Sequence, residues 1–189
     1  DFTMDRRQLI LGGAALSLFG SSAVMAQGLR PEFMPVEVAI RPDIAPNEIH
    51  VVPDSFMLFW TMPGGRAMRY MVGVGRPGLY EPGEFYVGAK KEWPSWTPTP
   101  SMIRREPEVY AKYADGVPGG INNPLGARAL YLFTPTRGDT YLRIHGTNAP
   151  NTIGTAVSNG CARLVNDQIE ELYAKVPMKS RVVLYPKSA

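Results

Sequence analysis

The chain has 189 residues, of which 44% are hydrophobic and 20% are charged, and its formal net charge is +3. This length suits one catalytic domain, and the composition is that of a globular protein rather than a disordered chain. No stretch concentrates Lys and Arg, so no nucleic-acid-binding surface is expected.

The first segment has the three parts of a secretory signal peptide. The Arg6-Arg7 pair gives a basic start, residues 9–19 form a short apolar core, and small residues end at Ala26. The apolar core is too short for a membrane-spanning helix, which needs about 20 residues. We therefore expect residues 1–26 to be a cleavable signal, with three extra residues ahead of its methionine. The arginine pair is compatible with the twin-arginine route and with ordinary secretion.

Short runs in which apolar and polar residues alternate dominate the rest of the chain. Residues 27–47 carry four prolines and no clear period, which predicts a linker or an extended lead-in. Beyond them, alternation between turn signals predicts the strands of a half-buried sheet. The predicted strands are residues 48–52, 56–60, 66–75, 84–89, 127–134, 140–145 and 181–185.

Two segments interrupt this pattern. Residues 92–108 contain Trp93, Trp96 and four prolines, which predicts an excursion from the sheet because proline cannot donate to a strand ladder. Residues 115–126 are rich in Gly, Asn and Pro and predict a second loop. Exposed tryptophans in the excursion would suit binding of a sugar or a peptide. Packing into a small satellite core is the favoured alternative, because large aromatic side chains are mostly buried.

One helix is predicted after the last loop, over residues 167–175. Asn166 is a natural N-cap, and apolar residues recur with helical spacing at Ile169, Leu172, Tyr173 and Val176. The sum of these elements is a mostly β domain with one clear helix.

Cys161 is the one cysteine of the sequence. In an exported chain it has no disulfide partner, so it is either a nucleophile or a buried, inert side chain. His145 ends a predicted strand, where it could take the proton of the thiol. Gly160 allows a sharp turn before the cysteine, and the backbone N–H groups of residues 160 and 161 could bind a developing oxyanion. A structural zinc site is disfavoured, because four Cys or His ligands are needed and the sequence has one Cys and two His.

The motifs around these residues resemble a known family. His145-Gly146-Thr147, then the run from Ser158 to Leu164 with the sequence Ser-Asn-Gly-Cys-Ala-Arg-Leu, then Asn166, resemble the signature of the L,D-transpeptidase catalytic domain, the YkuD family. Residues 91–100 and 123–132 are similar to segments of the exported Gram-negative members of the family. They extend the resemblance over residues 48–186. It implies a β-sandwich with a short helix after the cysteine and long loops, in a periplasmic protein.

The resemblance also implies an activity. Members act on peptidoglycan stem peptides: the cysteine forms a thioester with release of D-alanine, and an amine of a second stem completes a 3–3 cross-link. No metal or other cofactor is implied, and a monomer is expected. An outer-membrane protein as acceptor, or water in an L,D-carboxypeptidase, would use the same two residues. A non-catalytic wall-binding module is a further alternative, disfavoured by the presence of both His145 and Cys161.

Residue by residue, the resemblance assigns Cys161 as the nucleophile and His145 as its base. The carbonyl of Gly146 matches the group that orients the imidazole. Arg163 matches an arginine that braces the loop or holds a carboxylate, and bracing is favoured. Many members have His where this chain has Asn159, and Asn can form hydrogen bonds but cannot titrate.

Five further residues are considered from the pattern itself. Alternation places Tyr141 and Arg143 on the strand face of His145, where either could reach a substrate or be structural. Tyr131 is a candidate for the pocket wall. Asn166 is expected to cap the helix, not to take part in catalysis, and His50 is expected to be a structural or surface histidine.

Overall fold

The computed structural model describes residues 29–159 and 162–188. The expected signal over residues 1–26 and the candidates Gly160 and Cys161 lie outside these residues. Within the described chain the strands are β1 (Val36–Ala39), β2 (Ile49–Val52), β3 (Met57–Met62), β4 (Arg66–Met71), β5 (Val74–Gly75), β6 (Gly83–Glu92), β7 (Arg128–Thr134), β8 (Gly138–His145), β9 (Ala156–Ser158), β10 (Ala162–Arg163) and β11 (Arg181–Leu184). The α-helices are α1 (Pro100–Arg105), α2 (Pro107–Tyr110) and α3 (Asn166–Lys175). Short 3-10 turns are η2 (Pro31–Phe33), η3 (Pro53–Ser55), η4 (Ala111–Tyr113) and η5 (Pro150–Thr152).

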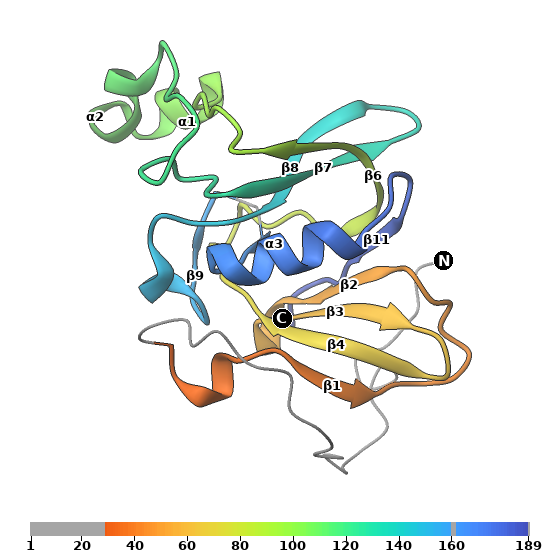
Figure 1. Ribbon diagram of the computed structural model, residues 1–189. Coiled ribbons are helices and arrows are strands. Elements are labelled where there is room, and N and C mark those ends of the chain that lie inside the picture. The colour runs from red at the N-terminus through yellow and green to blue at the C-terminus, as the bar shows by residue number, and fades with distance from the viewer. Residues whose placement is uncertain (1–28, 160–161, 189) are drawn as a thin grey trace.

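Nine strands form one mixed sheet in the order β1-β4-β3-β2-β11-β6-β7-β8-β10, and β5 and β9 pair separately. The β2–β11 and β8–β10 pairs are parallel, and the other pairs of the large sheet are antiparallel. In Figure 1 the part of the sheet formed by β6, β7 and β8 and the part formed by β1 to β4 lie on opposite sides of α3. The prediction of a mostly β domain with one clear helix is therefore confirmed, and the short helices α1 and α2 are additions to it.

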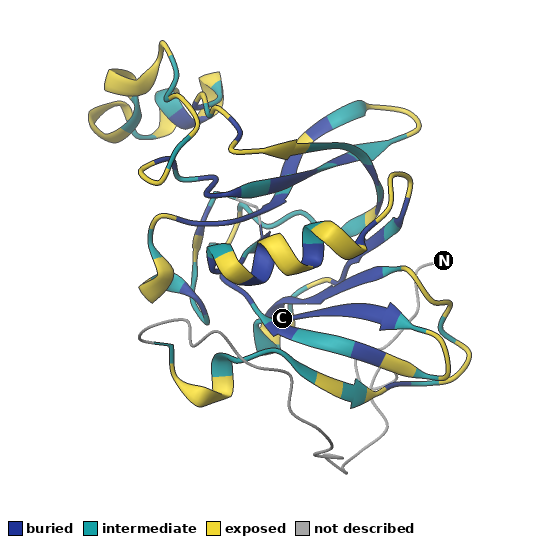
Figure 2. Cartoon of the chain, in the orientation of Figure 1, coloured by how far each residue is buried: buried dark blue, intermediate teal, exposed yellow. Residues whose placement is uncertain are grey.

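Helix α3 fills the space between the two parts of the sheet. Ile169, Leu172 and Val176 are buried in one core cluster with residues of β3, β4, β7 and β8. Burial of a Leu or Ile side chain contributes roughly 1.5–3 kcal/mol, so this face holds the helix in place. Figure 2 shows the opposite face of α3 exposed. The predicted helical face is thus confirmed.

The N-terminus of α3 differs from the prediction. The N-cap is Val165, with no side-chain capping bond, and Asn166 is already the first helical residue. The side chain of Asn166 instead accepts hydrogen bonds from the backbone N–H groups of Ala127 and Thr147, which lie in two other segments. Its oxygen is therefore not used to cap the helix.

The predicted strands are all present, with two changes. The run 66–75 is divided into β4 and β5, and β6 extends to Glu92. Three strands were missed: β1 and the short strands β9 and β10. Strand β1 lies inside the proline-rich residues 27–47 and pairs with β4 at one end of the sheet. Its alternation covers four residues, which is too short to stand out beside four prolines.

Tyr141 lies where the register between β7 and β8 shifts, between the Tyr131–Arg143 and Phe133–Asp139 pairs, and its φ is +63°. Burial still alternates along β8, because Thr140, Leu142 and Ile144 are buried whereas Tyr141 is 70% exposed. The guanidinium of Arg143 lies 5.9 Å from the centre of the Tyr141 ring. The alternation that placed Tyr141 on the face of Arg143 is therefore retained despite the bulge.

The predicted excursion projects from the sheet and contains α1 and α2 (Figure 1). Trp96 packs edge-on against Tyr110 and Tyr113, with ring centroids 6.2 and 5.9 Å away, as expected for a satellite cluster. Trp93 is 42% exposed, so the two tryptophans have different environments. A bridge between Trp96 and Val117 joins the two predicted loops into one unit.

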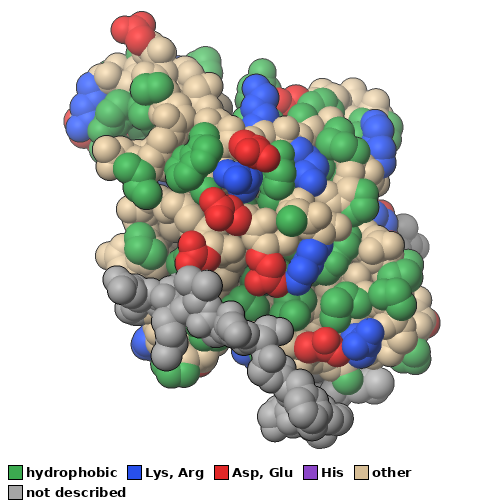
Figure 3. Space-filling view, viewed as in Figure 1, with side chains coloured by type: hydrophobic (Ala, Val, Ile, Leu, Met, Phe, Trp, Pro, Cys, Tyr) green, Lys and Arg blue, Asp and Glu red, His purple; other side chains and the backbone are tan. Residues whose placement is uncertain are grey.

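Acidic and basic side chains intermingle on the face that carries α3 (Figure 3). Several are paired there, including Lys175 with Glu171 and Arg128 with Glu170. In residues 29–159 and 162–188, no helix combines the length and the apolar character needed to cross a membrane.

Candidate active site

His145 is the last residue of β8 and is held from both sides. On one side its Cα pairs with Ala129 of β7, and on the other with Arg163 of β10. Its carbonyl oxygen accepts a hydrogen bond from the N–H of Leu164 at 2.9 Å. The side chain is 6% exposed. Backbone pairing therefore fixes the imidazole in a buried position.

The neighbouring carbonyl orients the ring. Nδ1 of His145 lies 2.5 Å from the carbonyl oxygen of Gly146, so Nδ1 carries the proton and donates it. Nε2 is then left with its lone pair, which is the form a general base needs. Gly146 thus has the contact that the resemblance implies for it.

Burial lowers the pKa of His145 to about 4. The Gly146 carbonyl raises the pKa and offsets part of this effect, while the charges of Arg163 and Arg143 lower it further. The described surroundings therefore favour a neutral imidazole at neutral pH. The charges of Arg163 and Arg143 act on this pKa because both arginines lie near the imidazole ring.

Asn166 braces the segment that follows His145. Its Oδ1 accepts hydrogen bonds from the N–H of Ala127 at 3.0 Å and from the N–H of Thr147 at 3.2 Å. The packing leaves no room for larger residues, because a Cβ at Gly146 would lie 2.3 Å from this oxygen and one at Gly126 would lie 2.2 Å from it. Two glycines and one asparagine thus fix the Gly146 carbonyl that orients the base.

Arg163 lies on β10, beside His145. Its backbone exchanges two hydrogen bonds of 2.9 Å with Gly73, and a Cβ at Gly73 would come within 3.0 Å of the arginine side chain. This close contact supports bracing as the role of Arg163.

Asn159 connects the site to the excursion. Its Nδ2 donates to the hydroxyl of Tyr110 at 2.7 Å, and its Oδ1 accepts from Arg105 at 2.8 Å. A second link lies beside it, where Glu106 pairs with Arg76 and the N–H of Arg76 donates to the carbonyl of Ser158. Asn159 therefore holds α1 and α2 against the segment before Gly160.

Tyr131 and Arg143 are neighbours across β7 and β8. The guanidinium of Arg143 lies 3.9 Å from the centre of the Tyr131 ring and donates two hydrogen bonds to Asp139, at 2.7 and 2.9 Å. Burial raises the pKa of Tyr131, so its hydroxyl stays protonated at neutral pH. Arg143 lies two residues before His145 on β8 and shares its strand face, as predicted, and the pairing of Tyr131 with Arg143 puts Tyr131 on that face too.

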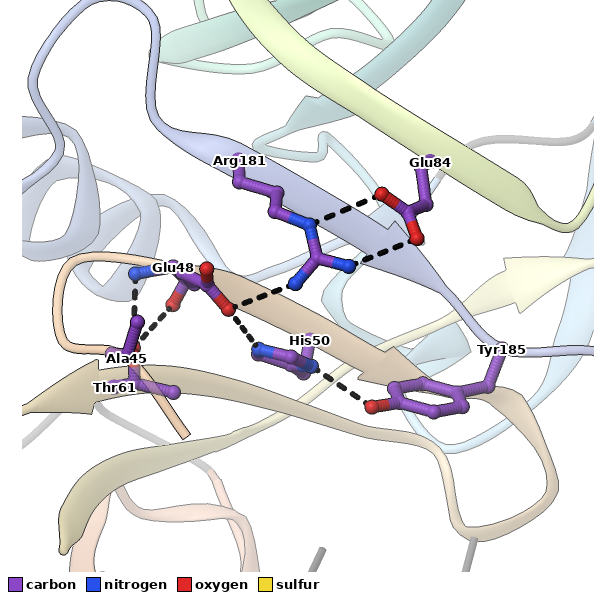
Figure 4. Close-up of polar contacts among 7 residues, drawn as sticks. All are labelled: Ala45, Glu48, His50, Thr61, Glu84, Arg181 and Tyr185. Atoms are coloured by element: carbon purple, nitrogen blue, oxygen red, sulfur yellow. Dashed lines mark hydrogen bonds and ion pairs between the residues drawn. The ribbon is translucent and has the colours of Figure 1, made fainter. Parts of the chain in front are cut away.

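His50 belongs to a separate polar network, drawn in Figure 4. It is fully buried, with Nδ1 3.0 Å from the Tyr185 hydroxyl and Nε2 2.9 Å from a Glu48 oxygen. Arg181 joins Glu48 to Glu84. Because β11, β6 and β7 lie between β2 and β8 in the sheet, this network is remote from His145. It supports the structural reading of His50.

Several of these partners were not found from the sequence. Arg105, Tyr110 and Asp139 have no recognisable motif, and the role of Asn166 was assigned to a local cap. Proximity of Arg105 and Tyr110 to Asn159 depends on contacts between segments about 50 positions apart. Among the described residues, no group of three or more His, Asp or Glu side chains is arranged to hold a metal ion.

Comparisons with known proteins cover most of this domain. The family model described as the L,D-transpeptidase catalytic domain, YkuD, matches residues 46–184. "Probable L,D-transpeptidase ErfK/SrfK" of Escherichia coli strain K12 is 40% identical over 132 residues, which are 66% of this chain and 39% of that protein. "Probable L,D-transpeptidase YbiS" of the same strain is 41% identical over 113 residues, 59% of this chain and 35% of that protein. The matched region thus spans less than half the length of these two relatives.

Two solved structures are also similar. A crystal structure from Brucella melitensis, described as a "Probable carnitine operon oxidoreductase", is 42% identical with a TM-score of 0.56, over 79% of this chain and 91% of that chain. L,D-transpeptidase 3 from Mycobacterium tuberculosis is 15% identical with a TM-score of 0.55, over 82% of this chain and 69% of that chain. The second likeness concerns the fold alone, and it confirms the fold class that the sequence motifs implied.

Proposed function

Because this chain belongs to the L,D-transpeptidase catalytic domain family, the YkuD family, we propose that it is a cysteine-dependent transpeptidase that forms 3–3 cross-links in peptidoglycan. Cys161 is the proposed nucleophile and His145 its base. The oxidoreductase description of one similar structure is not carried over, since a histidine base beside a cysteine motif suits acyl transfer.

One observation carries the proposal. The imidazole of His145 is buried, with Nδ1 bonded to the Gly146 carbonyl and Nε2 left as the acceptor. The parallel pairing of β10 with β8 sets Arg163 opposite His145, and Ala162, the first residue of β10, directly follows Cys161 in the sequence. This arrangement supports proton transfer from the thiol to Nε2.

In the first half-reaction, Sγ of Cys161 attacks the carbonyl carbon between the third stem residue and the terminal D-alanine, and the thiol proton passes to Nε2 of His145. The carbonyl oxygen becomes an oxyanion, for which the backbone N–H groups of Gly160 and Cys161 are the proposed donors. The C–N bond then breaks. The amine of D-alanine takes the proton from the imidazolium and leaves, and a thioester remains.

In the second half-reaction an amine of another stem attacks the thioester carbonyl. His145 takes a proton from that amine and returns it to sulfur as the C–S bond breaks. No nucleotide is consumed, because the thioester keeps the acyl group activated. Water in place of the amine would give a carboxypeptidase, and an amine of an outer-membrane protein would give an anchoring enzyme. Membership of the family supports the stem amine as the acceptor, and mass spectrometry of the products distinguishes it from water.

The proposed place of action follows from the substrate. Peptidoglycan lies outside the inner membrane, so we propose a periplasmic protein exported through the signal expected in residues 1–26. Fractionation of cells that express the full chain with a C-terminal tag tests this. A cytoplasmic fraction of uncleaved protein contradicts it.

The activity is tested by mass spectrometry. The mature protein is mixed with a disaccharide tetrapeptide, beside a Cys161→Ala control. The expected product is a dimer that lacks one D-alanine, present with the wild type and absent from the control. Trapping of the acyl-enzyme before acceptor is added should show Cys161 carrying the tripeptide.

Other outcomes lead elsewhere. Tripeptide without dimer contradicts cross-linking and identifies a hydrolase. Dimer that forms equally well with Cys161→Ala contradicts the assigned nucleophile.

A further inference from the structure

The strand face that carries His145 also carries a lysine in the same row. Across three neighbouring strands, Lys91 of β6 pairs with Ala129 of β7, which pairs with His145 of β8. Paired residues on adjacent strands project to the same side of a sheet, so Lys91 and His145 share one face. The residue between them, Ala129, has a side chain of one methyl group and is fully buried.

The adjacent lysine has the opposite orientation and a different environment. Nζ of Lys90 donates to the carbonyls of Tyr173 and Val176 at the end of α3, both at 2.7 Å. Lys90 therefore fastens the helix to the sheet, on the side away from His145. Because side chains alternate along β6, Lys90 faces α3 and Lys91 faces the side of His145.

Lys91 itself lies beside the aromatic ring of the next row. Its Nζ is 5.6 Å from the centre of Tyr131, and the side chain is exposed. In residues 29–159 and 162–188 no carboxylate lies within ion-pair distance of Lys91, and the neighbouring Glu92 is directed to Arg128, at 3.6 Å. The ammonium group is thus available to an anion.

Two arginines share this face with Lys91. Arg143 lies 3.9 Å from the centre of the Tyr131 ring, is paired with Asp139 through two hydrogen bonds, and has a side chain that is 12% exposed. Arg163 pairs with His145, and its side chain packs against Gly73, where an added Cβ would lie 3.0 Å from it. Of these three cations, Lys91 is the one whose side chain is exposed.

We infer that Lys91 binds the terminal carboxylate of the acyl donor and so selects stems that end in a free D-alanine. The inference rests on the proposed function. That carboxylate lies one residue beyond the attacked carbonyl, a span of at most about 3.6 Å. Two strand spacings separate the Cα atoms of Lys91 and His145 by about 10 Å, which the two long side chains can bridge. Charge complementarity with an ammonium group then favours the free acid over an amide.

The test compares two donors and three proteins. The donors are a stem tetrapeptide with a free terminal D-alanine and the same peptide with a terminal D-alaninamide. The proteins are the wild type, Lys91→Gln and Lys179→Gln. Lys179 is a matched control, because its Nζ also lies over a tyrosine ring, 4.5 Å from the centre of Tyr86, on a remote part of the molecule. Release of D-alanine or D-alaninamide is measured.

Lys91→Gln should reduce the preference for the acid, expressed as the ratio of kcat/KM for acid over amide, by about tenfold or more, the effect typical of a charge-assisted hydrogen bond. The change should appear mainly in KM for the acid and should weaken at high salt. Lys91→Arg should keep part of the preference. Lys179→Gln should keep the wild-type ratio.

An unchanged ratio in Lys91→Gln overturns the inference. A second result also overturns it. If amidation of the side-chain carboxylate of the third stem residue abolishes the difference in kcat/KM between the wild type and Lys91→Gln, the lysine binds that carboxylate and not the terminal one. If the wild type releases neither leaving group, the proposed function has failed, and binding still tests Lys91. Calorimetry with Cys161→Ala and with the Cys161→Ala, Lys91→Gln double variant should show weaker binding of the acid to the second protein, and equal binding contradicts the inference.

Discussion

The side-chain oxygen of Asn166 accepts a hydrogen bond from the backbone N–H of Thr147, two residues beyond His145, at 3.2 Å. The same oxygen accepts from Ala127 at 3.0 Å. Thr147 and Ala127 are both buried, so their N–H groups have no access to water. One side chain at the start of α3 therefore satisfies two buried donors and fixes the turn that orients the candidate base.

Replacement of Asn166 by Ala should lower the free energy of unfolding by roughly 1–3 kcal/mol, because it leaves two buried donors without an acceptor. It should also reduce kcat, since the Gly146 carbonyl loses its support. Urea denaturation and turnover measure the two effects. Asn166→Asp keeps the acceptor and should be milder, and Asp167→Ala on the same turn is the control. Wild-type stability in Asn166→Ala contradicts the bracing role.

The pH dependence of kcat/KM should report the buried imidazole. Burial lowers the pKa of His145 to about 4, and the base is active when unprotonated. Activity should therefore stay level from neutral pH to about pH 5 and fall below pH 4 as the imidazolium forms. Arg143→Gln removes a positive charge that lowers this pKa, so the acid limb should move to higher pH. An acid limb near pH 7 in the wild type contradicts this. Circular dichroism at each pH separates titration from unfolding.

The same shift predicts how stability varies with pH. The pKa of His145 is about 4 in the folded protein and near 6.5 when unfolded. Between these values the unfolded chain binds a proton that the folded chain does not, so stability is lost as pH falls through that window. The loss should be smaller in His145→Gln, measured by denaturation at pH 7 and pH 4.5. An equal loss in both proteins assigns the effect to other groups.

The bond between Tyr110 and Asn159 should couple the excursion to catalysis. Tyr110→Phe removes a hydrogen bond of 2.7 Å and should lower kcat several-fold while it costs about 1 kcal/mol of stability. Tyr113→Phe is the control, because Tyr113 packs on Trp96 in a similar way. In a double-mutant cycle, Tyr110→Phe and Asn159→Ala should show a coupling of about 0.5–3 kcal/mol. Strictly additive effects would falsify the coupling.

Substitution of His50 should lower stability, whereas substitution of His145 should lower activity. His50→Leu leaves the Tyr185 hydroxyl without its histidine partner and leaves Arg181 as the remaining partner of the Glu48 oxygen, so stability should fall by about 1–3 kcal/mol. The kcat/KM of the folded protein should stay near that of the wild type. His145→Ala should lower kcat by about 10²–10⁴. Tyr185→Phe removes one bond of the His50 network and should have a smaller effect on stability. A large loss of activity in folded His50→Leu contradicts the structural role.

Local pattern in the sequence was sufficient for the elements and the motif. Alternation with period two identified the paths of β2, β3, β7, β8 and β11, and the spacing of Ile169, Leu172 and Val176 identified the buried face of α3. These features depend on neighbours within a few residues, so they can be read along the chain. The chemical types of His145 and Cys161, and the glycines beside them, likewise identified the family by motif.

The tertiary structure decided which distant groups meet. Asn166 has the sequence of a helix cap, but two N–H donors from other segments take its side chain. Asn159 is held by α1 and α2, and the row from Lys91 through Ala129 to His145 depends on the register of three strands. The register shift between β7 and β8 at Tyr141 was likewise not visible along the chain. Register and long-range hydrogen bonds depend on how the whole sheet is assembled, and the spacing of residues along the chain does not specify them.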